Sequence, residues 1–564
     1  MSRPTAGCNS QTTPDEVLAQ RPVVSRGAAR RCLILAYFAV AALVPTVGLA
    51  ALLAANPPGR IASFDDDAYY YFRIAHNIVT GAGSTYDGFG RTNGYHPLWM
   101  LLLLPIFRFV HSPLGALPVV YLLASLFWVA SFAAMYAIGR RLHRPIAIAV
   151  AILPLAAFGS RFSGPGGVFL GGMEVVVTLL CVLLLLRMCL SSGYLTSAGP
   201  SRTAALAMGV VLAVTFLSRL DSVFFIAAFL LVAWARWRRQ NRQKLALLCW
   251  TALPVALAVL GYVALNRWYF GTAMPVSGQA KSLGAPTLNV QPLLVLLQFG
   301  DALGHHVYLG IVTGMATAAA LILWLRRRSS ARSESTDTVG YFLVAATIGL
   351  AALFAYLVVF TTYQAWSWYF YLLPINLTLA VFLLLDLGLE SRLDRAGTPV
   401  VAAVAVVAVA LPLLTGGLQY RQLRHETTNS TWVDHAVAVA DWLNKNTPSG
   451  SVMAMGDSAG AIGYLLHQPL VQLEGLVGAP DYVQSLSAGT APNFLRAKKV
   501  NYLIMTRPTA DFPTQDGCPR YVEPVQGRGP KMSLTLCAAD VVYSHLLDDG
   551  RRYVVWKYRS ELNP

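Results

Sequence analysis

The chain has 564 residues, of which 55% are hydrophobic and 12% are charged, and its formal net charge is +16. A soluble protein usually carries about a quarter charged residues, and the apolar residues here form runs of about 15 to 25, the length that a bilayer requires. This composition excludes an ordinary soluble protein. The surplus Lys and Arg residues lie in short clusters between the apolar runs, as the positive-inside rule predicts, so the charge indicates membrane topology and not a nucleic-acid partner.

A polar, basic tail of residues 1–31 comes first and ends in "RGAARR". The apolar run that follows is too long for the core of a signal peptide, so we expect an uncleaved anchor with the N-terminus in the cytoplasm. The apolar runs predict eleven spans, at about residues 32–54, 113–138, 144–160, 174–190, 203–217, 222–236, 244–265, 303–326, 340–361, 369–388 and 399–417.

An odd number of spans places the C-terminus outside if the N-terminus is inside. The basic segments "RRLHR", "RWRRQNRQK", "RRRSSAR" and "SRLDR" then all fall inside, which agrees with the charge rule. The apolar segment "HPLWMLLLLPIFRFV", residues 96–110, would break this pattern if it crossed, so we predict an interfacial or re-entrant segment. Residues 32–418 thus form a transmembrane module with an external loop at 56–112.

Long apolar runs stop at about residue 419. The segment "WVDHAVAVADWLNKN" has a helical pattern, and "SVMAM", "PLVQL", "NYLIM" and "RYVVWKY" are typical of strands. The predicted fold class is therefore a polytopic α-helical membrane protein with a C-terminal extracytoplasmic α/β domain, residues 419–564. Cys518 and Cys537 lie in this domain, either as a disulfide, which an oxidising compartment permits, or as a free pair.

The external loop contains "FDDDAYYYFRIAHNIVTGAG", residues 64–83. Adjacent carboxylates repel one another and are costly near a membrane without partners. One Asp would suffice to cap the helix that the following residues predict, so three indicate chemistry. A carboxylate could accept a proton from a hydroxyl while its neighbour orients it or raises its pKa. The tyrosines that follow offer flat surfaces for a sugar or form an interfacial aromatic belt.

An Asp-rich motif in the first external loop, an amphipathic helix after it and an "HP" dipeptide before an apolar segment resemble the GT-C superfamily of integral membrane glycosyltransferases. The resemblance implies a polyprenyl-phosphate-linked sugar as donor, and a glycan, lipid or protein acceptor of the cell envelope, activated by a carboxylate of this loop at the plasma (inner) membrane. Matching "DD" to the "DE" pair of the mannosyl- and aminoarabinosyltransferases selects Asp66 as the base. Matching "DAYYYFR" to the corresponding run of the oligosaccharyltransferase selects Asp67 and aligns Arg73. We predict Asp66, with Asp67 as the alternative and Asp65 as the helix cap.

Other polar residues on the outer side are candidates for binding substrate. Phosphate recognition favours Arg and Lys, and a leaving phosphate needs such charges. An acidic residue at the start of a span is either functional or suits the helix dipole. Arg219 either contacts the lipid phosphate or forms a structural ion pair with Asp221, and His96 either contacts substrate or forms a turn. The predicted substrate-binding residues are Tyr70, Arg73, His96, Glu174, Arg219, Arg267 and Lys281.

Three other interpretations are weaker. The three aspartates could hold a divalent cation with help from elsewhere, but the sequence has no strong metal motif and we expect no metal cofactor. "GDSAG", residues 456–460, fits a nucleophile elbow with Ser458, either Asp540 or Asp548, and His545 as a hydrolase triad. Only Asp540 fits the usual chain order of Ser, Asp and His, and a structural turn is favoured. A transporter or flippase of a lipid-linked precursor would explain the spans, but no inverted repeat is evident. The resemblance to the GT-C superfamily therefore implies an inverting membrane glycosyltransferase.

Overall fold

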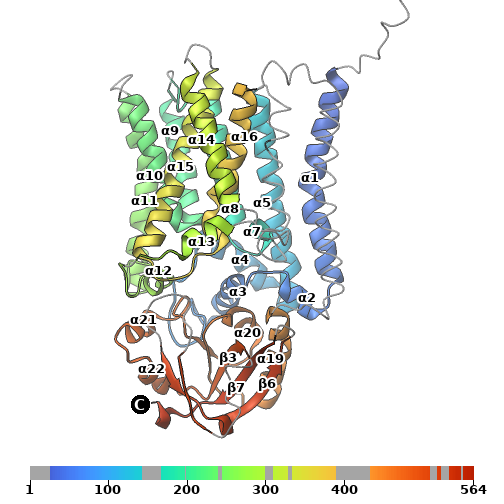
Figure 1. Cartoon of the computed structure of the whole chain (residues 1–564), viewed down its shortest axis with the longest axis vertical. Helices are drawn as coiled ribbons and strands as arrows, with labels where there is room; N and C mark the ends of the chain where they lie inside the picture. The colour runs from blue at the N-terminus through green and yellow to red at the C-terminus, as the bar shows by residue number, and fades with distance from the viewer. Residues whose placement is uncertain are drawn as a thin grey trace, which may run out of the picture.

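The computed structural model describes residues 26–142, 151, 167–196, 199–238, 244–286, 288–298, 309–327, 333–388, 432–508, 517–522, 532–547 and 550–563. It consists of a bundle of long helices and an α/β domain that lies against one end of the bundle (Figure 1). A layer of short helices lies between these two parts, and the candidate site is built there.

The long helices of the bundle follow the apolar runs of the sequence. They are α1 (Arg26–Ala54), α5 (Pro113–Leu142), α8 (Val175–Ser192), α9 (Arg202–Ser218), α10 (Val223–Trp237), α11 (Leu245–Tyr269), α14 (Leu309–Arg326), α15 (Glu334–Phe360) and α16 (Leu372–Gly388). Apart from residue 151, the predicted spans 144–160 and 399–417 lie outside the described residues, and each of the others coincides with a helix. Six helices in the described part are long and apolar enough to cross a membrane, so the total of eleven spans stays a prediction.

Several helix boundaries differ from the predicted spans, and the start of α15 shows why. Helix α15 begins at Glu334, six residues before the predicted span, because polar residues start the helix before its apolar run begins. The Ser333 side chain accepts a hydrogen bond from the backbone N–H of Thr336, and Glu334 and Asp337 lie in the first turn, where the helix dipole favours acidic groups.

Short helices cover the end of the bundle that faces the α/β domain (Figure 1). They are α2 (Pro57–Ala62), α3 (Asp66–Val79), α4 (Pro97–Phe109), α7 (Gly167–Leu170), α12 (Val276–Lys281) and α13 (Gln291–Gln298). Helix α4 has 13 residues. That length gives about 20 Å, less than the roughly 30 Å of a hydrocarbon core. This agrees with the prediction that residues 96–110 do not cross.

The α/β domain contains a five-stranded sheet in the order β2-β1-β3-β7-β6. Strands β1 (Met453–Met455), β2 (Leu470–Gln472) and β3 (Tyr502–Pro508) are parallel, and β7 (Arg551–Lys557) and β6 (Val541–Leu546) add antiparallel pairs. Its helices are α19 (Trp432–Asn446), α20 (Ala459–Leu465), α21 (Pro480–Ser487) and α22 (Ala491–Ala497). The predicted helix and the four predicted strands are confirmed. A small sheet of β4 (Arg520–Val522) and β5 (Ser533–Thr535) lies near a Cys518–Cys537 disulfide.

The two parts are joined by packing between short helices. Helix α20 packs on α3, α19 on α2 and α21 on α12. Aromatic rings fill the contact between α3 and α20: Tyr464 lies 5.4 Å from Tyr69, 5.8 Å from Phe72 and 6.2 Å from Phe107, measured between ring centroids. Aromatic pairs of this kind add to the stabilisation from apolar burial, so they strengthen the contact between α3 and α20.

Candidate active site

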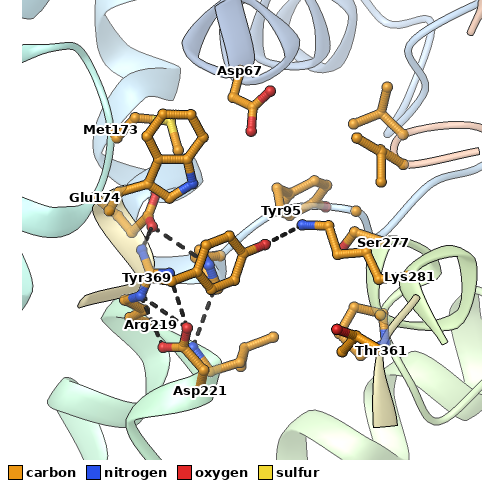
Figure 2. A pocket seen from close by; sticks show the side chains of 18 of the residues that line it. Asp67, Tyr95, Met173, Glu174, Arg219, Asp221, Ser277, Lys281, Thr361 and Tyr369 are labelled. Atoms are coloured by element: carbon orange, nitrogen blue, oxygen red, sulfur yellow. Dashed lines mark hydrogen bonds and ion pairs between the residues drawn. The ribbon is translucent and has the colours of Figure 1, made fainter. Parts of the chain in front are cut away.

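A cavity of about 350 Å³ lies where the bundle, the short helices and the α/β domain meet. Its walls come from α3, the loop before α4, the start of α8, the turn between α9 and α10, α12 and the 3-10 turn Ser367–Phe370, with Leu476 and Val477 from the α/β domain. Figure 2 shows Asp67, Glu174, Arg219, Lys281 and Tyr369 around this space. Most of the predicted substrate residues, far apart in the sequence, therefore share one cavity.

Asp67, in the first turn of α3, directs its carboxylate into this cavity (Figure 2). Within the described part of the chain it accepts no hydrogen bond and forms no ion pair. Burial raises its pKa to about 6, with further raising from Asp457 and Glu174, while Lys281 lowers it. A carboxylate that is accessible, without a partner and titrating near neutral pH has the properties of a general base.

Asp66 faces the α/β domain instead. Its two carboxylate oxygens accept hydrogen bonds from the backbone N–H groups of Gly460, at 2.9 Å, and Ala461, at 2.8 Å. Burial raises its pKa to about 7, against the lowering effect of these two bonds. A Cβ atom at position 460 would lie 2.1 Å from the Asp66 carbonyl oxygen, so only glycine fits there. Because both oxygens of the Asp66 carboxylate are bound by the backbone of α20, the structure favours Asp67 over Asp66 as the base. The sequence had favoured Asp66, with Asp67 as the alternative.

Asp65 occupies the N-cap position of α3, as predicted, although its side chain makes no capping hydrogen bond. The backbone N–H of Asp65 donates a hydrogen bond of 3.2 Å to the carbonyl oxygen of Gly171, which holds this residue in place. Burial, together with the neighbouring carboxylates of Asp67 and Asp66, raises the pKa of Asp65 well above its usual value.

Glu174 and Arg219 form a buried cluster with Asp221 on one wall of the cavity (Figure 2). The Glu174 side chain is fully buried, and its Oε1 accepts a hydrogen bond of 2.6 Å from Arg219. Another edge of the guanidinium donates hydrogen bonds to the Asp221 carboxylate, from Nε at 2.8 Å and from Nη2 at 2.9 Å. Tyr71 donates to Glu174 Oε2 at 3.0 Å. The cluster carries one positive and two negative charges, so it does not attract a phosphate. Two roles were predicted for Arg219, contact with the lipid phosphate or an ion pair with Asp221, and the structure contains the ion pair.

His96 is fixed between this cluster and the start of α4. Its Nδ1 accepts a hydrogen bond of 3.1 Å from the backbone N–H of Leu220. In the neutral ring the proton is therefore on Nε2, which lies 3.5 Å from Glu174 Oε1. Burial lowers the pKa of His96 to about 3, and Arg219 lowers it further, while Asp221 opposes this. His96 is therefore a neutral donor near neutral pH.

Lys281, the last residue of α12, lies on the wall across from this cluster (Figure 2). Its ammonium donates a hydrogen bond to the hydroxyl of Tyr369 and lies over the rings of Tyr363 and Tyr369. Burial lowers its pKa, but Tyr369 and Asp67 outweigh this and the net shift is upward, so the group is a cation. No carboxylate of the described residues is within ion-pair distance of it, which leaves its charge available to an anionic ligand.

Two predicted substrate residues lie outside the cavity. Arg73 donates to the carbonyl oxygen of Leu466 at 2.8 Å and contacts that of Gln468 at 3.5 Å, so it binds the α/β domain. Arg267 is exposed and donates to the carbonyl oxygen of Gly271. Tyr70 does line the cavity, with its ring edge-on to Tyr86.

Tyr71 and Tyr369 belong to the site but were not predicted as site residues. Both stand in aromatic runs, which are more often interfacial belts than sites. Their roles depend on contacts with Glu174 and Lys281, which lie 103 and 88 positions away in the sequence. The polar partner of a tyrosine hydroxyl, which could have identified them, is not visible in the sequence.

The hydrolase triad suggested by "GDSAG" is not assembled. Asp540 is bound by Arg559, at 2.6 Å, and His545 contacts His435, at 2.8 Å. Ser458 has a φ of 65° and occupies the N-cap position of α20, which makes this segment the turn that presents Gly460 to Asp66. The described residues also contain no group of three His, Cys, Asp or Glu side chains spaced to hold a metal ion; metal dependence itself stays a prediction.

Comparisons with known proteins identify the fold. Residues 420–553 match a family model described as a domain of unknown function, DUF8728. No curated protein matches the sequence. Among solved structures, the archaeal oligosaccharyltransferase AglB from Archaeoglobus fulgidus, in complex with an inhibitory peptide and a dolichol-phosphate, is similar with a TM-score of 0.50 and 13% identity, covering 85% of this chain and 69% of that chain. ArnT from Cupriavidus metallidurans bound to undecaprenyl phosphate has a TM-score of 0.48 and 14% identity, covering 93% of this chain and 97% of that chain. The predicted resemblance to the GT-C superfamily is confirmed at the level of the fold.

Proposed function

We propose that this protein is a membrane glycosyltransferase that moves a sugar from a polyprenyl-phosphate donor to a hydroxyl group of a cell-envelope acceptor. The observation that carries the proposal is the Asp67 carboxylate, which faces a cavity without a hydrogen-bond partner among the described residues, in the same cavity as the unpaired cation of Lys281. A base and a phosphate-binding cation around one space are the two charges that this transfer requires.

In the proposed reaction, Asp67 accepts the proton of the acceptor hydroxyl as the hydroxyl oxygen attacks the anomeric carbon of the donor sugar. The bond from that carbon to the phosphate oxygen breaks, and polyprenyl phosphate leaves with the bonding electron pair. One displacement inverts the configuration at the anomeric carbon. Desolvation of Asp67 supports this role, because a carboxylate with a pKa of about 6 is ionised near neutral pH yet accepts a proton more readily than an ordinary aspartate.

Lys281 is the residue that we assign to the phosphate. Its ammonium has no carboxylate partner among the described residues, whereas Arg219 is held by Glu174 and Asp221. The cluster of Arg219, Glu174 and Asp221 instead orients His96 and closes one wall of the cavity. Tyr70 also lines the cavity, and we propose that its ring contacts the sugar or the acceptor.

The proposal places the site on the extracytoplasmic side. Helix α5 follows α4, and α10 follows the Arg219 turn, so both start at the end of the bundle that carries the site. Both end in basic residues at the opposite end: Arg140 and Arg141 in α5, and Arg236 in α10. The positive-inside rule assigns that end to the cytoplasm. The predicted division into a tail (1–31), a membrane module (32–418) and an external domain (419–564) is part of the proposal.

The test uses the purified protein in nanodiscs with a panel of polyprenyl-phosphate sugars and candidate acceptors, and measures the release of free polyprenyl phosphate. We expect release from one donor by the wild type, and its loss in Asp67→Asn. Asp65→Asn is the matched control, because it makes the same carboxyl-to-amide change at a neighbouring residue that does not line the cavity. If the protein bound a donor but released no polyprenyl phosphate with any acceptor, the result would favour the alternative function, a transporter or flippase of a lipid-linked glycan precursor.

A further inference from the structure

A second cavity, of about 440 Å³, lies beside α3 and is separate from the candidate active site. It is bounded by the C-terminal half of α3, the end of α4, the connection between α4 and α5, and the end of α20 with His467. Successive residues of a helix are rotated by about 100°, so His76 points to the side of α3 opposite Asp67. No residue lines both cavities.

Arg73 brings an uncompensated charge to this second cavity. Its guanidinium is largely withdrawn from water, and its contacts are with the carbonyl oxygens of Leu466 and Gln468. Desolvation lowers its pKa, and among the described residues no carboxylate forms an ion pair with it. Buried charges in proteins are usually paired with an opposite charge, so a guanidinium with only carbonyl partners beside a cavity favours an anion there.

Three histidines line the same cavity: His76 on α3, His111 in the connection between α4 and α5, and His467 after α20. Nδ1 of His76 is buried without a hydrogen-bond partner among the described residues. The described lining contains no Asp or Glu. Histidine and arginine donors without any acidic neighbour form a site for an anion, and a phosphate presents several acceptor oxygens to such donors.

The position of the cavity indicates where the anion comes from. Phe107 and Val110, at the end of α4, belong to its lining. Leu101 and Phe109 on the same helix are 62% and 80% exposed, which for apolar side chains of a membrane protein indicates contact with lipid. Helix α4 lies at the end of the bundle next to the α/β domain (Figure 1). The ends of membrane-spanning helices lie at the level of the lipid headgroups. An anion that enters beside α4 is therefore a lipid headgroup more readily than a solute.

We propose that this cavity binds the phosphate group of an anionic membrane lipid, with Arg73, His76 and His111 as donors and the acyl chains along the exposed side of α4. The lipid would connect three elements of different origin: α3, the connection between α4 and α5, and the α/β domain at His467. This site is independent of the proposed transfer reaction, which uses the opposite side of α3.

The test measures lipid binding to the whole protein by native mass spectrometry in detergent. Phosphatidylglycerol is titrated into the wild type and into the double variant His76→Gln/His111→Gln, which keeps Arg73 and its contacts with the α/β domain. We expect the tightest phosphatidylglycerol site to weaken by about tenfold in the double variant, because charge-assisted hydrogen bonds to phosphate are lost. Phosphatidylcholine, which has no net charge, is expected to bind the wild type more weakly than phosphatidylglycerol.

Arg108→Gln is the matched control. It removes a positive charge from the exposed side of α4, close to the membrane surface but outside the cavity lining, and we expect it to change the affinity by no more than about twofold. Equal phosphatidylglycerol affinity in the wild type and the double variant would overturn the proposal. Displacement of the lipid by inorganic phosphate at an equal concentration would overturn its assignment to a lipid and identify a soluble phosphate as the ligand.

Discussion

The carboxylate of Asp66 accepts a hydrogen bond of 2.9 Å from the backbone N–H of Gly460, 394 positions later in the chain. The next residue, Asp67, points into the cavity instead. Two adjacent aspartates thus divide two tasks: the first fixes α3 to the α/β domain, and the second is left available for chemistry.

Substitution of Asp67 should abolish the proposed transfer while leaving the fold intact. Asp67→Asn keeps the size of the side chain and removes only its ability to accept a proton, so we expect the rate to fall by about 10²- to 10⁴-fold. The rate is measured as release of polyprenyl phosphate, and folding as the thermal unfolding midpoint. Wild-type rates in Asp67→Asn would show that the base is another residue.

Substitution of Asp66 should act mainly on stability. Asn at this position places an amide N–H₂ group opposite one of the two backbone donors, so we expect a loss of about 2 to 3 kcal/mol and an earlier unfolding transition. Tryptophan fluorescence during heating measures this, with Asp65→Asn as the control for the same carboxyl-to-amide change. If Asp66→Asn unfolded like the wild type but had no activity, Asp66 and not Asp67 would be the base.

Lys281→Met should weaken donor binding. The variant keeps the length and apolar stem of the side chain but loses the charge that we assign to the phosphate, so KM for the donor should rise by about 10- to 100-fold. Arg267→Met is a matched control, because Arg267 is an exposed cation from the same stretch of sequence and does not line the cavity. A larger effect from Arg267→Met than from Lys281→Met would contradict the assignment.

The pH dependence of kcat/KM should follow the ionisation of Asp67. The base must be deprotonated, and its pKa is about 6, so activity should be lost as the pH falls through that value and reach a plateau above it. Lys281 lowers the pKa of Asp67, so its removal should move the midpoint to higher pH. An acid limb that does not move in Lys281→Met would show that another group titrates.

Chelation of divalent cations should leave transfer unchanged. A metal ion bound by Asp67 would need a second carboxylate ligand. On the wall that contains Glu174, both carboxylate oxygens of Glu174 already accept hydrogen bonds, from Arg219 and Tyr71. The measurement compares release of polyprenyl phosphate with and without EDTA. Loss of activity that Mg²⁺, Mn²⁺ or Zn²⁺ restores would contradict this prediction.

Much of the fold was predictable because long apolar runs and short β-branched strands are local signals. The different surroundings of Asp66 and Asp67 were not predictable, because the two residues are adjacent in one motif and differ through the approach of α20, which binds Asp66. The motif match predicted Arg73 as a substrate-binding residue, but Arg73 does not line the candidate active site, since its partners Leu466 and Gln468 belong to the α/β domain. Contacts between distant segments decided each of these cases.

The bond between α3 and α20 also constrains how this protein can be divided or recombined. A truncated chain that ended before the α/β domain would leave Asp66 beside two other carboxylates with neither of its backbone donors, and would remove Leu476 and Val477 from the wall of the cavity. A chimaera with a foreign external domain would need a glycine at the position of Gly460, where any side chain collides with α3. A foreign external domain would therefore have to supply both the glycine and the two backbone donors that bind Asp66.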